Sequence, residues 1–193
     1  SILEAIKLKF ESPKKMKSQT SVFLEPSSDF DLSSKHRLIS KGQYRIASVF
    51  ILLRETKQDV RVIFTRRSRK LSSHPGQISF PGGLVEPNDS TIISAGLREV
   101  REEIGLNKKN IKTIGSLPTH ETVSKFLIHP FVGVIHGSVG FKINTEEVVE
   151  LFEVPLGFLL DRENMTEHKI EKGQKYMGYY AIPYGPYYIW GAT

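Results

Sequence analysis

Apolar positions follow two periods along the chain, and each predicts a kind of element. An apolar run over 46–53, bounded by polar residues, is typical of a strand buried on both faces. Residues 60–65 alternate in the manner of a second strand. Further strands are expected where β-branched and aromatic residues gather: 111–118, 126–135 and two short strands within 177–189.

The strongest helix prediction covers residues 90–105. Asp89 or Ser90 is expected to cap its start, and Gly105 to end it. Weaker helical patterns are found at 2–10, 146–152 and 155–160. This order of elements predicts a fold of the α/β class, a mixed sheet with helices packed on it.

Residues 12–41 are rich in Ser, Lys and Pro and predict an irregular arm over the surface. We therefore expect an N-terminal helix and arm at 1–41, packed on one main domain at 42–193. The sequence ends on an apolar stretch, so we expect further C-terminal residues, which a helix would suit. It opens on Ser1 without a secretory signal pattern, which leaves a removed leader open.

Composition excludes several classes of protein. With 193 residues and 39% apolar side chains, the chain is an ordinary globular sequence of one-domain size. No apolar run approaches the roughly 18–20 residues of a membrane-spanning helix. The absence of cysteine excludes disulfides, thiolate metal sites and a cysteine nucleophile, and it is compatible with a reducing cytoplasm.

Charge is distributed unevenly. Residues 1–85 hold 16 basic and 7 acidic side chains, whereas 86–193 hold 11 and 14. Such asymmetry suits a polyanionic partner, although surface charge that only maintains solubility would look the same.

The 90–105 helix carries the most informative side chains. Its apolar stripe, which faces the core, consists of Ile93, Leu97, Val100 and Ile104. Glu99, Glu102 and Glu103 share another face, where like charges repel and weaken the helix. Carboxylates so arranged suit a hard divalent cation. A solvated acidic face offset by neighbouring arginines is the alternative.

A Gly/Pro-rich segment, 79–87, leads into this helix. Its paired Gly82 and Gly83 allow a ligand to approach the backbone, and a carbonyl there would face the carboxylates across a metal. A simple tight turn is the alternative.

Together these residues resemble the Nudix box. The matching positions are Gly83, Asp89, Arg98-Glu99, Glu102-Glu103 and Gly105-Leu106. Two features depart from the family pattern: Asp89 replaces the usual Glu, and eight residues rather than seven separate it from Arg98. The resemblance implies an α/β/α sandwich with a mixed β-sheet from about residue 45 onward.

A second resemblance lies upstream. Residues 64–71 and 76–83, which include Arg67, Ser68 and Gly82, are similar to the extra motif of the coenzyme A pyrophosphatase branch. Ser72 stands where that motif has a second Arg.

The resemblance implies hydrolysis of a nucleoside-linked diphosphate with Mg²⁺ or Mn²⁺. Glu99, Glu102, Glu103 and the Gly83 carbonyl would be the metal ligands. Arg98 would orient Glu99 through a charge-assisted bond.

The general base lies outside the box in many family members, on a later loop. Glu147 is the candidate here, with Glu146 and Glu150 close behind. An acid-rich first turn of a helix explains the same three residues. The pair His120-Glu121 is a further option.

Arg67 is the expected substrate contact, together with Ser68 and Gly82 of the two motifs. Arg45 would reach a phosphate or an adenine ring, and either arginine is otherwise a surface charge. Trp190 and the Tyr-rich 184–188 are expected to pack the core.

The sequence thus favours a cytoplasmic, metal-dependent hydrolase that splits coenzyme A into 3′,5′-ADP and 4′-phosphopantetheine. The alternatives are another nucleoside diphosphate derivative, such as ADP-ribose or a dinucleoside polyphosphate, and a non-catalytic nucleotide-binding module. The basic residues lack an RNA-binding aromatic signature. We therefore expect a small-molecule substrate with no nucleic acid or membrane partner, and a homo-oligomer is left open.

Overall fold

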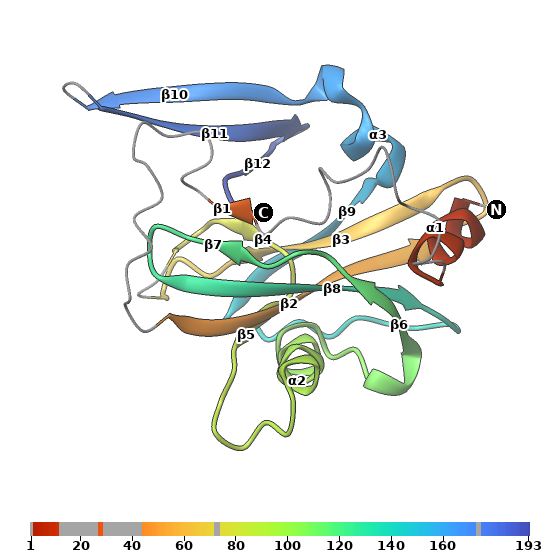
Figure 1. The fold of residues 1–193 in the computed structure, drawn as a ribbon. Coiled ribbons are helices and arrows are strands. Elements are labelled where there is room, and N and C mark those ends of the chain that lie inside the picture. Colours follow the sequence, from red (N-terminus) through yellow and green to blue (C-terminus); the bar gives the residue numbers. More distant parts are fainter. Residues whose placement is uncertain (1, 12–26, 29–43, 72–73, 173–174) are drawn as a thin grey trace.

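The computed structural model describes residues 2–11, 27–28, 44–71, 74–172 and 175–193. Within these ranges the chain forms a mixed β-sheet covered by helices, which confirms the α/β class and the sandwich (Figure 1). None of the described helices is both long and apolar enough to cross a membrane.

The large sheet has nine strands. They are β1 (Ser27–Ser28), β2 (Arg45–Glu55), β3 (Val60–Arg67), β4 (Ile78–Ser79), β5 (Gly82–Leu84), β6 (Ile111–Ser116), β7 (His120–Glu121), β8 (Phe126–Ile135) and β9 (Val148–Pro155). Strand β2 is central, because it pairs in parallel with β8 and antiparallel with β3 and β5. Strand β9 lies antiparallel to β3 on the other side.

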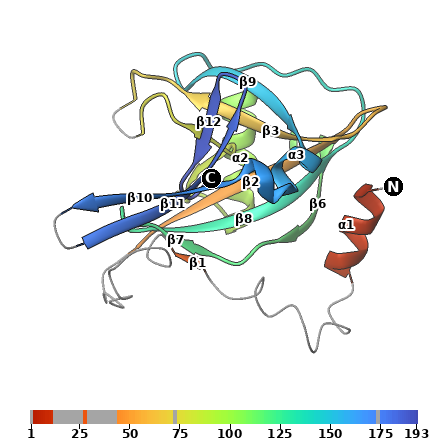
Figure 2. The ribbon, with the colours of Figure 1, turned by 90° about the horizontal axis from the view of Figure 1, so that it is seen from above.

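Helices cover both faces of this sheet. Helix α2 (Ile92–Ile104) lies on one face, below the sheet in the view of Figure 1. The opposite face carries α1 (Ile2–Glu11), α3 (Leu156–Leu160) and a three-stranded antiparallel sheet (Figure 2). Its strands are β10 (Thr166–Lys172), β11 (Lys175–Tyr184) and β12 (Tyr187–Trp190). Two short 3₁₀ helices, η2 (Lys108–Asn110) and η3 (Arg162–Asn164), complete the described elements.

The core is divided by the large sheet into two apolar layers. Phe50, Leu52 and Ile63 face α2, where they meet Val100 and Ile104 of the predicted stripe. The layer on the other face contains Leu53, Val62, Phe64 and Val154, together with Leu3 of α1. Strand β3, which confirms the strand expected at 60–65, is therefore buried on both faces.

Local sequence explains why α2 forms where it does. Its N-cap is Thr91, whose hydroxyl accepts from the backbone N–H of Ser94 while the Ser94 hydroxyl accepts from Thr91 N–H. The prediction of Asp89 or Ser90 as the cap was wrong, because Asp89 is engaged by Arg98. Gly105 adopts a left-handed conformation with φ 71° and ends the helix, as predicted.

The helix expected at 146–152 is a strand instead. Residues Val148–Pro155 pair with β3 along its length, and Val148, Phe152 and Val154 are buried. Their burial against the sheet outweighs a helical spacing of acidic and apolar residues. The helices expected at 2–10 and 155–160 are confirmed as α1 and α3.

Other predictions meet mixed outcomes. The segment 79–87 is not wholly a loop, because Gly82–Leu84 pairs with β2 as β5. Trp190 is 38% exposed, so its expected place in the core was wrong, whereas Tyr184 and Tyr187 do pack against the core. The arm expected at 12–41 lies outside the described residues except for Ser27–Ser28.

Candidate active site

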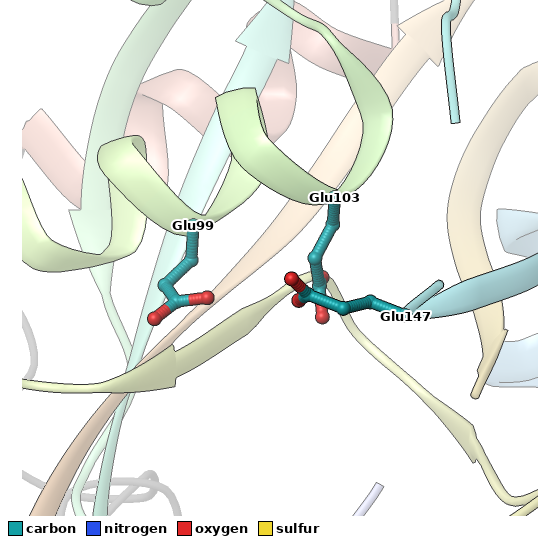
Figure 3. A group of neighbouring side chains, drawn as sticks. All are labelled: Glu99, Glu103 and Glu147. Carbon is teal, nitrogen blue, oxygen red and sulfur yellow. The ribbon is translucent and has the colours of Figure 1, made fainter. Parts of the chain in front are cut away.

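Three carboxylates meet beside the C-terminal half of α2. Glu99 and Glu103 project from the helix one turn apart, and Glu147 reaches toward Glu103 from the segment just before β9 (Figure 3). One oxygen of each lies within 4.8 Å of one oxygen of the others. Three oxygen ligands at this spacing are a donor set that suits a hard divalent cation.

Glu103 is the most deeply buried member of this carboxylate group. Its side chain is 2% exposed. Burial raises the pKa of Glu103 to about 8, against the opposing effects of the Gly82 N–H and of Arg67. Burial also raises the pKa of Glu99, with Arg98 opposing it. Burial therefore favours the neutral form of both carboxyl groups in the folded protein.

Arg98 binds several acceptors around this group. Its Nε and Nη2 donate to the two carboxylate oxygens of Asp89, each at 3.0 Å, and Nη2 also donates to the Leu84 carbonyl at 3.0 Å. Its Nη1 donates to Glu99 at 2.9 Å and to Glu102 at 3.0 Å. Arg98 therefore contacts Glu99, the residue that the resemblance predicts it to orient.

Asp89 anchors Arg98 from the loop before the helix. It also accepts the backbone N–H of Glu86, and the bond from Arg98 is the main cause that lowers the pKa of Asp89. The sequence left only a capping role for Asp89, whereas the structure gives it the bidentate contact that fixes the guanidinium.

Glu102 lies apart from the carboxylate group. Its side chain is 51% exposed and its carboxylate contacts Arg98. The group contains Glu99, Glu103 and Glu147, so a metal-ligand role for Glu102 stays a prediction.

The two glycines of β5 border the group directly. The Gly82 N–H donates to Glu103 Oε2 at 3.1 Å. A Cβ on Gly83 would overlap the carboxylate of Glu99, so only glycine permits this approach. The Gly83 backbone thus lies where the sequence expected it, beside a carboxylate of the helix.

The upstream motif reaches the same place from the end of β3. Arg67 Nη1 lies 3.7 Å from Glu103 Oε1, and the buried Ser68 donates its N–H to the Glu147 carbonyl at 2.7 Å. Both residues expected to bind substrate therefore adjoin the carboxylate group. Arg45 instead lies at the start of β2, with its guanidinium 4.1 Å from the centre of the Phe126 ring.

The structure distinguishes among the candidate bases. Glu146 is exposed and pairs with Lys70 at 3.7 Å, and Glu150 accepts from the Tyr187 hydroxyl at 2.5 Å. Of these three acids, only Glu147 belongs to the carboxylate group. The pair His120-Glu121 forms β7 and is not part of the group.

One residue of the site was missed by sequence reasoning. Asn144 Nδ2 donates to Glu147 Oε1 at 3.1 Å. The available signal was an Asn two residues before an acidic pair, a spacing common in side-chain-capped turns.

Comparison with known proteins agrees with this geometry. Residues 44–171 match the NUDIX domain family. A protein of Pectobacterium atrosepticum named uncharacterized Nudix hydrolase NudL is 39% identical over 134 residues, which cover 68% of this chain and 69% of that one. A protein of the same name from an Enterobacter species is 33% identical over 149 residues, 77% of each chain.

A solved structure shares the fold. The C. elegans Ap4A hydrolase binary complex superposes with a TM-score of 0.50 at 15% identity, covering 57% of this chain and 80% of that one. The chain thus belongs to the Nudix family and is a Nudix hydrolase, an enzyme class that acts on nucleoside diphosphate derivatives with the help of divalent metal ions.

Proposed function

We propose that this enzyme hydrolyses the diphosphate bond of coenzyme A, or of its derivatives, to 3′,5′-ADP and 4′-phosphopantetheine with Mg²⁺ or Mn²⁺. The observation that carries the proposal is the contact between two motifs. The upstream segment, which resembles the coenzyme A branch, places Arg67 beside Glu103 and Ser68 beside the Glu147 backbone.

The residues present fit a divalent cation. Three carboxylates converge, Arg67 lies beside one of them, and Arg98 is already engaged by Asp89, so the negative charge is only partly compensated. Glu99, Glu103 and the Gly83 carbonyl would hold the ion, and Glu102 is a further ligand by resemblance. When bound, such an ion neutralises diphosphate oxygens and lowers the pKa of a bound water.

The protein groups have distinct proposed roles. Glu147 accepts a proton from the attacking water, since its carboxylate already faces the group. Arg98 keeps Glu99 oriented through the bond at 2.9 Å. Arg67, together with Ser68 and Gly82, contacts the diphosphate, where a guanidinium offsets charge that grows during hydrolysis.

Arg45 would meet a more distant part of the substrate. It stacks on Phe126 at the start of β2, and a stacked guanidinium also offers a face to an adenine ring or donors to a phosphate.

Two further parts of the proposal concern the whole chain. We propose a domain boundary between residues 41 and 42. We also propose a cytoplasmic location, because a cysteine-free chain suits a reducing compartment.

The test compares substrates directly. We would incubate the purified protein with coenzyme A, ADP-ribose or a dinucleoside polyphosphate, each with Mg²⁺ or Mn²⁺, and identify the products by mass spectrometry. We expect coenzyme A to yield 3′,5′-ADP and 4′-phosphopantetheine. Faster turnover of ADP-ribose, with coenzyme A untouched, would sink the coenzyme A assignment. A folded protein that turns over none of them would favour a nucleotide-binding module.

A matched pair of variants tests the carboxylate group. Glu103→Gln should lower the rate by about a hundredfold or more, the usual scale for losing a group that stabilises the transition state. Glu146→Gln, on the same turn as Glu147 but with an exposed side chain outside the carboxylate group, should keep the wild-type rate. Equal rates in both variants would contradict the assignment of Glu103.

A further inference from the structure

We infer that Asn144 is the positioning residue that holds the Glu147 carboxylate beside Glu103. This inference rests on the proposed function, because it assigns a task within the same site. It concerns a residue outside both motifs, on the turn that precedes β9.

Both ends of the Asn144 side-chain amide form hydrogen bonds. Its Nδ2 donates to Glu147 Oε1 at 3.1 Å, and its Oδ1 accepts the backbone N–H of Glu146 at 3.2 Å. A carboxylate only accepts and the NH₂ only donates, so this pairing fixes which way the amide faces.

The backbone of Asn144 is tied to α2. Its N–H donates to the Glu103 carbonyl at 2.9 Å, and the Lys142 N–H donates to the Ile104 carbonyl at 2.9 Å. Carbonyls in the last turn of a helix have no partner within the helix. Asn144 therefore donates to one of these free carbonyls at the end of α2. That carbonyl belongs to Glu103, whose side chain is the buried carboxylate of the group.

The turn itself is closed by the Asn144 carbonyl. It accepts from Glu147 N–H at 3.0 Å and from Val148 N–H at 2.8 Å. One residue thus joins the main chain of Glu103 to both the main chain and the side chain of Glu147. Asn144 thereby fixes the turn before β9 against α2, two parts of the chain more than 40 positions apart in sequence.

Glu147 requires such a restraint for a physical reason. Glu99 and Glu103, when ionised, repel the Glu147 carboxylate and so favour rotation of its flexible side chain toward solvent. The bond from Asn144 Nδ2 to Glu147 Oε1 opposes that rotation. Without it, the productive orientation would be populated less often, and binding of the substrate would be affected little.

Two variants separate this task from turn formation. Asn144→Ser retains a hydroxyl able to accept the Glu146 N–H but is too short to reach the carboxylate, and Asn144→Asp retains Oδ1 but replaces the donor with an acceptor. Asn107 offers the matched control. Its Oδ1 accepts the Lys109 N–H at 3.1 Å in the same i to i+2 geometry, and among the described residues its amide has no hydrogen bond to a carboxylate.

We would measure kcat and KM for coenzyme A, and Mn²⁺ binding to the substrate-free protein by electron paramagnetic resonance. Asn144→Ser should lower kcat about 10- to 100-fold, the scale of one lost hydrogen bond to a charged group, with KM close to wild type. Its Mn²⁺ affinity should also fall, because the Glu147 carboxylate, held beside Glu103, attracts the cation even though it is not one of the proposed ligands. Asn144→Asp should lower kcat likewise, and Asn107→Ser should match wild type in all three quantities.

A readout independent of turnover keeps the two proposals apart. We would compare ¹⁵N spectra of the wild-type protein and of Glu147→Gln. The side-chain NH₂ resonances of Asn144 should differ between the two, whereas those of Asn107 should not. Wild-type kcat and Mn²⁺ affinity in Asn144→Ser, or unchanged NH₂ resonances, would overturn the inference. If the wild type turns over no substrate, the proposed function fails, and the Mn²⁺ titration and the spectra still decide the task of Asn144.

Discussion

At the scale of single residues, the site depends on carboxyl groups whose burial disfavours their charged form. Glu103 is almost wholly buried, and Arg67 and the Gly82 N–H are the described neighbours that favour its charged form. Burial of this kind destabilises the charged form and is common where charge is reserved for a ligand. The cost should be visible in the metal-free protein.

Stability of the metal-free protein should therefore depend on pH through Glu103. Its pKa is raised from 4.5 to about 8, so the folded state binds an extra proton between these values. The contribution of this proton to the stability of the folded state is fully present below about pH 4.5 and is lost as the pH rises toward 8. In EDTA, the melting temperature should fall over this range in wild type and fall less in Glu103→Gln.

The comparison between the two proteins isolates Glu103, since every other titratable group is common to both. Melting temperatures are read at each pH by differential scanning fluorimetry. Parallel pH curves for the two proteins would show that Glu103 is not the group responsible.

At the scale of elements, α2 must approach the large sheet closely for its carboxylates to meet β5 and Glu147. Gly96 permits this approach, because it lies against Ser48 and Phe50 of β2. Sequence reasoning identified the apolar stripe of α2 but had no signal for which residue touches the central strand.

Gly96→Ala should destabilise the protein. Alanine favours a helix interior by about 1 kcal/mol, but a new Cβ would lie 2.8 Å from the Phe50 ring, and overpacking of this kind costs about 1–3 kcal/mol. The clash involves a rigid buried ring, so the overpacking term should win. Chemical denaturation measures the change in the free energy of unfolding.

The control for this substitution is Gly157→Ala in α3, where no atom lies within 4 Å of the added Cβ. It should leave stability unchanged or raise it slightly. A Gly96→Ala variant as stable as wild type would show that α2 has room to move away from β2.

Elements also show where local pattern was insufficient. The 90–105 helix was predictable because its periodicity and Gly105 act within one segment. The 146–152 segment was mispredicted because its conformation is set by pairing with β3, some 80 residues earlier. Two-residue strands such as β4 and β7 carry too few residues for any periodic signal.

At the scale of the whole molecule, the uneven charge has a structural counterpart. The basic excess of residues 1–85 includes Arg67, which adjoins Glu103, while the carboxylate group comes from the acidic remainder. Cation and acid from the two parts thus meet at one site between β3 and α2.

Divalent metal should stabilise the whole fold. An ion bound only by the folded state adds about 2.7 kcal/mol at a concentration 100 times Kd. Mg²⁺ or Mn²⁺ should therefore raise the melting temperature of wild type and raise that of Glu103→Gln much less. Calorimetric scans with and without metal, using Glu146→Gln as a control that should respond like wild type, make the measurement. An equal rise in Glu103→Gln would place the stabilising ion elsewhere.

The sequence by itself determined the helix that bears Glu99, Glu102 and Glu103, and the family to which the chain belongs. Both depend on residues close together in the chain, where helical periodicity and motif spacing apply directly. Only the tertiary structure decided that Glu147 joins the carboxylate group while Glu102 turns to Arg98. That choice depends on the Asn144 turn being fastened to the end of α2, a contact between distant segments to which no local pattern corresponds.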